Sequence, residues 1–262
     1  MLNMFEKVIE TARKAGEATL EYYNQEIEVE TKEDDSPLTK ADLAAHKIIT
    51  EALETIDPET PVISEEGGLP SYEERKHWEK FWIVDPLDGT KEFIKKNGEF
   101  TINIALVEQG EPVFGVVYVP AQQVTYYGSK QDGSFRQDGA GDPVRIYSEQ
   151  ADKLTPLKVV CSRSHGSSDL EDQLKKQGIT VEETMPAGSS IKFCLVAEGK
   201  ADIYPRMGPT MEWDVAAGDC VYRNSAKNGQ HPSPLTYNKP DLKNGSFVIG
   251  LNDDSMNKNR NS

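Results

Sequence analysis

Residues 81–90 read FWIVDPLDGT, and this stretch predicts how the rest of the chain is organised. Its four apolar residues indicate a short buried strand that stops at Asp85. Asp followed by Pro is favourable turn chemistry, so the chain is predicted to bend between Asp85 and Asp88 at the rigid Pro86. The two carboxylates are therefore expected on one side of the bend.

A short helix is predicted directly after the bend. Gly89 lets the backbone approach whatever the carboxylates hold, and Thr90 is predicted to be the N-cap of a helix over residues 91–94. Free N–H groups at a helix N-terminus favour an anion, whereas carboxylates repel one. Both features are compatible if divalent metal ions lie between them. A solvated Asp-Pro-x-Asp turn with an ordinary cap is the alternative that this stretch alone leaves open.

Further carboxylates occupy the ends of other predicted elements. A strand over residues 61–64 ends at Glu65 and Glu66, and Asp214 opens a predicted helix. Asp42 follows the N-cap threonine of another helix by three residues, as in a capping box. Alone, the glutamates fit a solvated acidic loop and Asp42 fits a capping acid. Together with the bend, these acids match a site for two or three metal ions, because Mg²⁺ prefers oxygen ligands and a metal pair can bind both oxygens of a displacement.

The composition limits the classes of function. The 262 residues carry a net charge of −15, which disfavours polymeric nucleic acid and anionic membrane surfaces as partners. No apolar run approaches the ~20 residues that span a bilayer, and the acidic N-terminal helix does not resemble a signal peptide. Three cysteines without CxxC spacing predict reduced thiols in the cytosol. GxSxG, P-loop and HExxH motifs are absent, which favours metal-activated water over a protein nucleophile.

Hydrophobic periodicity divides the chain into two halves. Residues 1–153 are predicted to place helices on a mostly antiparallel sheet, with an irregular charged loop at residues 29–36. Residues 154–251 alternate strands with helices, which indicates an α/β layer. Residues 252–262 are polar and are predicted to be disordered. The sequence thus predicts a mixed α/β chain of one large domain or two closely packed ones.

Three motifs, in this order, resemble the signatures of the inositol monophosphatase superfamily. They are EE at residues 65–66, DPLDGT at residues 85–90 and WDVAAG at residues 213–218. DGTKEFI, SPLTKAD, SRSH, GSSIKFCLVAEG and YPR are similar to its 3'(2'),5'-bisphosphate nucleotidase branch, and the T-N-F run usual in the inositol branch is absent. The resemblance implies a layered α/β/α/β/α sugar-phosphatase fold and a magnesium-dependent, lithium-sensitive phosphomonoesterase. Its expected small-molecule substrate is adenosine 3',5'-bisphosphate, which would give AMP and phosphate, and 3'-phosphoadenylyl sulfate is a second one.

The resemblance also implies roles for the acidic residues. Thr90 and Asp42 would orient the attacking water, and Glu66 would lie close to the metals. The implied ligands are Glu65, Asp85 and the Leu87 carbonyl for one Mg²⁺ ion, and Asp85, Asp88 and Asp214 for another. The implied catalytic residues are Asp42, Glu65, Glu66 and Thr90.

A nucleotide subsite is implied beside the metals. Lys192 lies one turn into a predicted helix, and Arg206 follows a predicted strand end, which suits both to a phosphate. Ordinary surface charge is the alternative for these two cations. The residues implied to bind substrate are Glu65, Leu87, Asp88, Gly89, Thr90, His165, Ser189, Lys192, Arg206 and Asp214.

Two other functions stay open at this point. An inositol-phosphate or sugar-phosphate phosphatase would share the same acidic core. A non-catalytic cation-binding module would keep the acids but have no use for Thr90 or the GSSIK segment. The branch implies a cytoplasmic protein that can associate with the inner face of a membrane, and the sequence leaves the oligomeric state undetermined.

Overall fold

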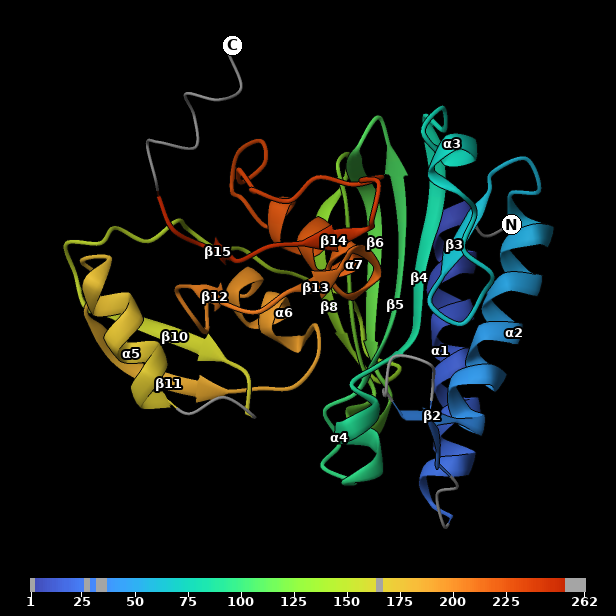
Figure 1. Cartoon of the computed structure of the whole chain (residues 1–262), viewed down its shortest axis with the longest axis horizontal. Coiled ribbons are helices and arrows are strands. Elements are labelled where there is room, and N and C mark those ends of the chain that lie inside the picture. The colour runs from blue at the N-terminus through green and yellow to red at the C-terminus, as the bar shows by residue number, and fades with distance from the viewer. Residues whose placement is uncertain (1–2, 26–28, 32–36, 164–166, 253–262) are drawn as a thin grey trace.

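The computed structural model describes residues 3–25, 29–31, 37–163 and 167–252. It has the expected layered α/β/α/β/α architecture, which Figure 1 shows from the α1–α2 pair through the central sheet to the α5 side. The predicted disordered tail lies outside the described residues except for Asn252, whose backbone N–H donates to the Ala151 carbonyl. Among the described residues, every helix is too short or too polar to cross a bilayer.

The first layer is a pair of helices, α1 (Met4–Tyr23) and α2 (Lys40–Ile56). Their small and branched residues, such as Ala12 and Ile49, pack on Trp82 and Val84 of the sheet. Between the helices, β1 (Val29–Thr31) and β2 (Pro37–Thr39) pair antiparallel. The prediction of an irregular loop at residues 29–36 is therefore wrong for its first three residues, and residues 32–36 lie outside the described part of the chain.

The second layer is a seven-stranded sheet with the strand order β3-β4-β5-β6-β7-β8-β9. Only β3 and β4 run parallel among its neighbouring pairs, so the predicted, mostly antiparallel sheet is confirmed. In β4, Trp82 faces the α1–α2 layer, whereas Phe81 and Ile83 belong to the core on the other face. Both faces are covered, which explains the continuous apolar run. The elements of this layer and its connections are β3 (Val62–Ser64), α3 (Tyr72–Arg75), β4 (Lys80–Asp88), α4 (Thr90–Ile94), β5 (Thr101–Glu108), β6 (Glu111–Val119), the 3₁₀ turn η1 (Pro120–Gln122), β7 (Val124–Ser129), β8 (Gly133–Asp138) and β9 (Val144–Arg145).

The third layer consists of α6 (Ile191–Ala197) and α7 (Glu212–Arg223). At Gly115, a Cβ atom would lie 2.7 Å from the Ala217 carbonyl, so glycine lets α7 approach β6 closely. The core on this face joins residues of both predicted halves, including Phe81 and Ile249. The division at residue 153 stays a prediction.

The remaining layers lie beyond α6 in Figure 1. β10 (Leu157–Cys161) and β11 (Val181–Pro186) run parallel, and α5 (Ser167–Lys176) connects them. This is the predicted strand–helix alternation of the second half. The second half also contains four short strands, which are β12 (Tyr204–Arg206), β13 (Thr210–Met211), β14 (Lys243–Asn244) and β15 (Phe247–Ile249).

Candidate active site

The Asp-Pro-Leu-Asp segment is a β-bulge in β4 and not the predicted turn. Strand β4 continues to Asp88. Along the neighbouring strand β5, Asp85 pairs with Asn103 and Asp88 pairs with Thr101. One extra residue on β4 is therefore accommodated between the two acids. Pro86 fits there because a bulge interrupts the ladder of backbone hydrogen bonds. The bulge performs the expected task, since it directs both carboxylates toward the same cleft.

Gly89 is the N-cap of α4, and Thr90 is the first helical residue, so the predicted N-cap is one residue off. Gly89 has φ +91°, a left-handed conformation that glycine adopts without steric cost. A Cβ atom there would lie 3.1 Å from Ser189 Oγ. Glycine at this position therefore lets the loop before α6 approach the end of β4.

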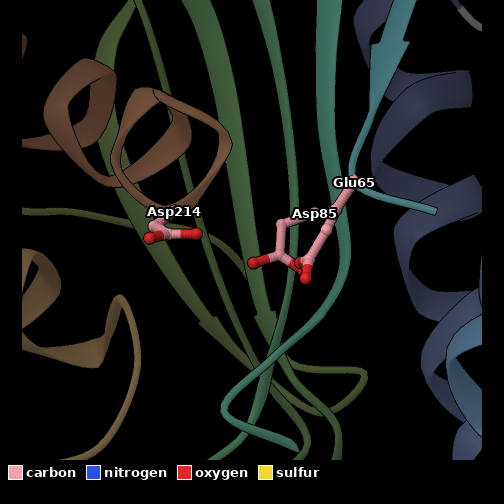
Figure 2. A group of neighbouring side chains, drawn as sticks. All are labelled: Glu65, Asp85 and Asp214. Atoms are coloured by element: carbon pink, nitrogen blue, oxygen red, sulfur yellow. The ribbon is translucent and has the colours of Figure 1, made fainter. Parts of the chain in front are cut away.

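Carboxylates from three separate elements meet beside the bulge. Oxygens of Glu65, Asp85 and Asp214 all lie within 4.8 Å of one another, and Figure 2 shows them turned toward a common space. Parallel pairing of β3 and β4 sets Ser64 opposite Val84, so that Glu65 and Asp85 follow side by side. Asp214 comes from the first turn of α7.

The Asp214 side chain is fixed by the start of its helix. Its Oδ2 accepts a hydrogen bond from the Met211 backbone N–H at 2.9 Å. In the bulge, Asp85 Oδ1 likewise accepts from the Leu87 N–H at 3.0 Å. Both acids use one oxygen to hold the local backbone, which orients the carboxylate without removing its charge.

Three aspartates at this site, Asp85, Asp88 and Asp214, have raised pKa values. Burial, together with the negative charges of Glu65, Asp88 and Asp214, holds the pKa of Asp85 well above its ordinary range. Burial raises the pKa of Asp88 to about 6, although the nearby Lys192 ammonium opposes the shift. Burial and then the Asp88 charge raise the pKa of Asp214 to about 8.

These shifts have one physical meaning. Several carboxylates share a space that solvates them poorly, and each disfavours the ionised form of the others. A divalent cation would relieve the repulsion and use the same oxygens as ligands. The donor set, oxygen only and rich in carboxylate, therefore fits hard divalent metal ions.

Thr90 and Asp42 are brought together across α4 and α2. Thr90 Oγ1 lies 3.4 Å from Asp42 Oδ1, and the other Asp42 oxygen accepts the Thr39 N–H at 2.8 Å. The capping box predicted at the start of α2 is present. Asp42 is buried, with 2% exposure, so it caps α2 with one oxygen and faces Thr90 with the other.

Two cavities share a wall at this place. The first, of about 320 Å³, contains the carboxylates, and the second, of about 250 Å³, contains most of the site's cations. Both are bordered by Asp88, Gly89, Lys91, Glu92 and Asp214. A ligand with two anionic groups can therefore reach both.

Besides the shared wall, the cationic cavity is lined by three further predicted substrate residues, Ser189, Lys192 and Arg206. Lys192 is buried, and its Nζ donates to the Ser189 carbonyl at 2.6 Å and lies 5.5 Å from the centre of the Tyr204 ring. Burial lowers the pKa of Lys192 to about 8, although the Asp88 charge opposes the shift.

Arg206 lies within β12 and not after a strand end, which corrects the prediction. Its guanidinium donates to Ser162 Oγ at 3.2 Å and to the carbonyls of Gly208 and Pro209 at 3.2 and 3.1 Å. These contacts hold the side chain against the cavity without cancelling its charge.

Two predicted residues are placed differently from the rest. Glu66 is half-buried and, among the described residues, is not part of the lining of either cavity. His165 lies outside the described residues. The functional roles predicted for the whole set stay predictions.

Four charged residues near the cavities were not predicted to have a role. Lys91, Glu92 and Arg163 line the cationic cavity, and Glu99 contacts Arg163 from behind. Lys91 and Glu92 directly follow the DGT motif, and Arg163 lies in SRSH. Their positions in or beside these motifs could have indicated a role, because neighbours of a ligand-binding motif often share its cavity.

A profile of the inositol monophosphatase family matches residues 2–232. Among curated relatives, a protein named 3'(2'),5'-bisphosphate nucleotidase CysQ from Salmonella typhimurium is 50% identical over 220 residues, 83% of this chain and 86% of that protein. One of the same name from Escherichia coli strain K12 is 47% identical over 256 residues, 95% of this chain and 100% of that protein. The crystal structure of CysQ from Bacteroides thetaiotaomicron, described as a bacterial member of the inositol monophosphatase family, has 42% identity and a TM-score of 0.75, and the match covers 93% of this chain and 95% of that one.

The chain belongs to the inositol monophosphatase family. This family is metal-dependent, and the cluster of Glu65, Asp85 and Asp214 supplies the acidic side chains that such dependence requires. The resemblance stated from the three motifs is thereby confirmed, as is the layered fold.

Proposed function

We propose that the protein is a Mg²⁺-dependent phosphomonoesterase that removes the 3'-phosphate of adenosine 3',5'-bisphosphate and releases AMP and phosphate. The observation that carries this proposal is the shared wall between a carboxylate cavity and a cationic cavity. A substrate with two phosphates satisfies both cavities at once. The relatives named as nucleotidases, which are 47–50% identical to this chain, support the same substrate class.

Glu65, Asp85, Asp88, Asp214 and the Leu87 carbonyl would hold the metal ions on the side of the scissile phosphate. When bound, Mg²⁺ lowers the pKa of an attacking water and neutralises charge on the leaving oxygen. The carboxylates, of which Asp85 is buried, would hold these ions where electrostatic stabilisation is stronger than in bulk water. The same acids would otherwise repel the phosphate.

Thr90 and Asp42 orient the attacking water in this proposal. Asp42 Oδ1 accepts a hydrogen bond from Thr90 Oγ1, and Thr90 lines the carboxylate cavity, so its hydroxyl oxygen would accept a hydrogen bond from the water. Because Asp42 is buried and held by the start of α2, it keeps the threonine hydroxyl in one orientation.

Lys192 and Arg206 receive the phosphate that is not cleaved. Both side chains line the cationic cavity, and in a chain of net charge −15 such local cations are needed to hold an anion. On this view residues 1–153 supply the EE and DPLDGT motifs of the metal site, and residues 154–251 supply Asp214 of the WDVAAG motif together with the nucleotide wall. We also infer a cytosolic location, because the three cysteines are free and buried.

A phosphate-release panel tests the proposal. It compares adenosine 3',5'-bisphosphate with 3'-AMP, inositol 1-phosphate and a hexose phosphate, each with Mg²⁺ and with EDTA. We expect the highest kcat/KM with the bisphosphate and no turnover in EDTA. Preference for inositol 1-phosphate would assign the site to the other phosphatase class, and metal binding without any phosphate release would indicate a cation-binding module.

A further inference from the structure

Glu99, in the loop between α4 and β5, gathers groups from two loops of the other half of the chain. Its carboxylate accepts two hydrogen bonds from the Arg163 guanidinium, the one from Nε at 2.7 Å, and a third from the Gly188 backbone N–H at 2.8 Å. The backbone carbonyl of Glu99 accepts a hydrogen bond from the Ser189 hydroxyl. The Glu99 side chain is 16% exposed and that of Arg163 is 45% exposed, so the bond from Gly188 lies in the more buried part of this contact.

The groups that Glu99 holds form a wall of the cationic cavity. Arg163, Gly188 and Ser189 all line it. The backbone carbonyl of Ser189 in turn accepts a hydrogen bond from the Lys192 ammonium at 2.6 Å. A chain of contacts therefore runs from the Glu99 carboxylate to the cation that receives the phosphate.

The backbone of this wall depends on Glu99 for its shape. Ser189 has φ +40°, an uncommon conformation for a residue with a side chain. Its hydroxyl bond to the Glu99 carbonyl holds that conformation. At Gly188, a Cβ atom would lie 2.6 Å from the Glu99 carbonyl oxygen and 3.0 Å from Glu92 Cγ, so the two loops are in direct contact.

Glu99 itself does not border the substrate space. In the described part of the chain, neither cavity has it in its lining. Its negative charge would also repel a phosphate if it did. Its contribution must therefore act through Arg163 and the segment 188–192.

We propose that Glu99 is a positioning residue that fixes the phosphate-binding wall of the second half against the first half, which carries the EE and DPLDGT motifs, and thereby determines how strongly a bisphosphate is preferred over a monophosphate. The substrate preference in this inference rests on the proposed function, whereas the positioning of the wall by Glu99 does not.

The kinetic test uses Glu99→Gln, which removes the charge and keeps the shape. We expect KM for adenosine 3',5'-bisphosphate to rise about ten-fold or more, since hydrogen bonds to a charged group are lost, with kcat within about three-fold because the metal ligands are untouched. KM for 3'-AMP should stay within about two-fold, because this substrate lacks the second phosphate. A parallel rise for both substrates, or no rise, would overturn the proposal.

Glu198→Gln is the matched control. Glu198 also forms a partly buried pair with an arginine, Arg136, with Nη1 2.9 Å from Oε2, but it lies at the opposite end of α6. The same chemical change at that position should leave both KM values unchanged. If Glu198→Gln raised KM for the bisphosphate as much as Glu99→Gln does, the effect would be general loosening and the proposal would be wrong.

Hydrogen exchange gives a readout that needs no substrate. In Glu99→Gln, amides of residues 187–192 should lose protection by about ten-fold, whereas those of β4 and β5 should keep it. Unchanged protection at residues 187–192 would refute the positioning role whatever the enzyme cleaves. Conversely, parent protein that exchanges as expected but does not cleave the bisphosphate would refute only the proposed function.

Discussion

Replacing Asp88 by asparagine should stabilise the metal-free protein while it abolishes activity. The substitution removes one charge from a crowded carboxylate cluster at almost constant volume. Burial raises the pKa of Asp88 from 3.8 to about 6, against the opposing charge of Lys192. In the absence of metal the ionised carboxylate therefore costs the folded state free energy, and asparagine removes that cost.

The size of the effect follows from linkage. A shift of roughly two pKa units corresponds to about 3 kcal/mol at about 1.4 kcal/mol per unit. The Asp88 side chain is partly exposed, and solvent screening reduces this to about 1–2 kcal/mol. Because the folded state binds the proton more tightly, the cost is absent below the unfolded pKa, develops between about pH 4 and pH 6, and is complete above pH 6.

Urea denaturation in EDTA measures this cost. At about pH 7.5 the midpoint for Asp88→Asn should exceed that of the parent by roughly 0.5 M, for an m value of about 2–3 kcal/mol/M. The difference should shrink at about pH 5, where part of the penalty is lost. With Mg²⁺ the order should reverse, and turnover of the bisphosphate should fall by about 100-fold or more, as a metal ligand is lost.

The control for Asp88→Asn is Asp142→Asn, which makes the same change at an exposed loop position. That variant should match the parent in EDTA, in Mg²⁺ and in turnover. If Asp88→Asn were less stable than the parent in EDTA at about pH 7.5, the carboxylates would not repel one another as the structure indicates. Turnover within a few-fold of the parent would remove Asp88 from the metal site.

Three further results are expected. Thr90→Val should lower kcat by about 10²–10⁴-fold in a phosphate-release assay, while Mg²⁺ still raises the melting temperature, because the hydroxyl beside Asp42 is lost and the metal ligands remain; a normal kcat would exclude this pair from orienting water. The kcat/KM for the bisphosphate should fall as pH rises above about 8, because burial lowers the pKa of Lys192 and its ammonium loses its proton there in the free enzyme. The Lys192→Arg variant should be less active than the parent, but its kcat/KM should stay constant to higher pH. Equal pH profiles for the two proteins would contradict this role of Lys192. Gly89→Ala should lower stability by about 1–3 kcal/mol in thermal or urea unfolding, since φ is +91° and Ser189 Oγ lies 3.1 Å from the added Cβ; an unchanged stability would mean that the loop yields without cost.

The sequence predicts the acidic cluster well because each acid lies at a fixed place on an element that periodicity reveals. Glu65 follows β3 and Asp85 ends the apolar run of β4, so parallel pairing of these strands brings them together. Asp214 sits in the first turn of α7, where an acid is favoured and can be recognised. Their convergence within 4.8 Å is a tertiary fact that only the resemblance and the structure supply.

The local errors have a common cause. A turn and a β-bulge share Pro and Gly as signals, and only the partner strand decides between them. Asp88 pairs with Thr101 of β5, so the segment stays in the sheet. The same pairing delays the start of the next helix, and the left-handed Gly89 becomes its cap where Thr90 was predicted.

Glu99 marks the limit of what a pattern along the chain can reveal. Its partners Arg163 and Gly188 lie 64 and 89 residues away, and an isolated glutamate after a short helix carries no periodic or spacing signal. Motifs expose residues that must contact the reacting groups, because those groups constrain type and spacing together. A residue that holds others in place is constrained only by their three-dimensional arrangement. In this chain the acidic cluster is therefore predictable from the sequence, whereas the contact that fixes the cationic wall against the first half has to be found from the fold.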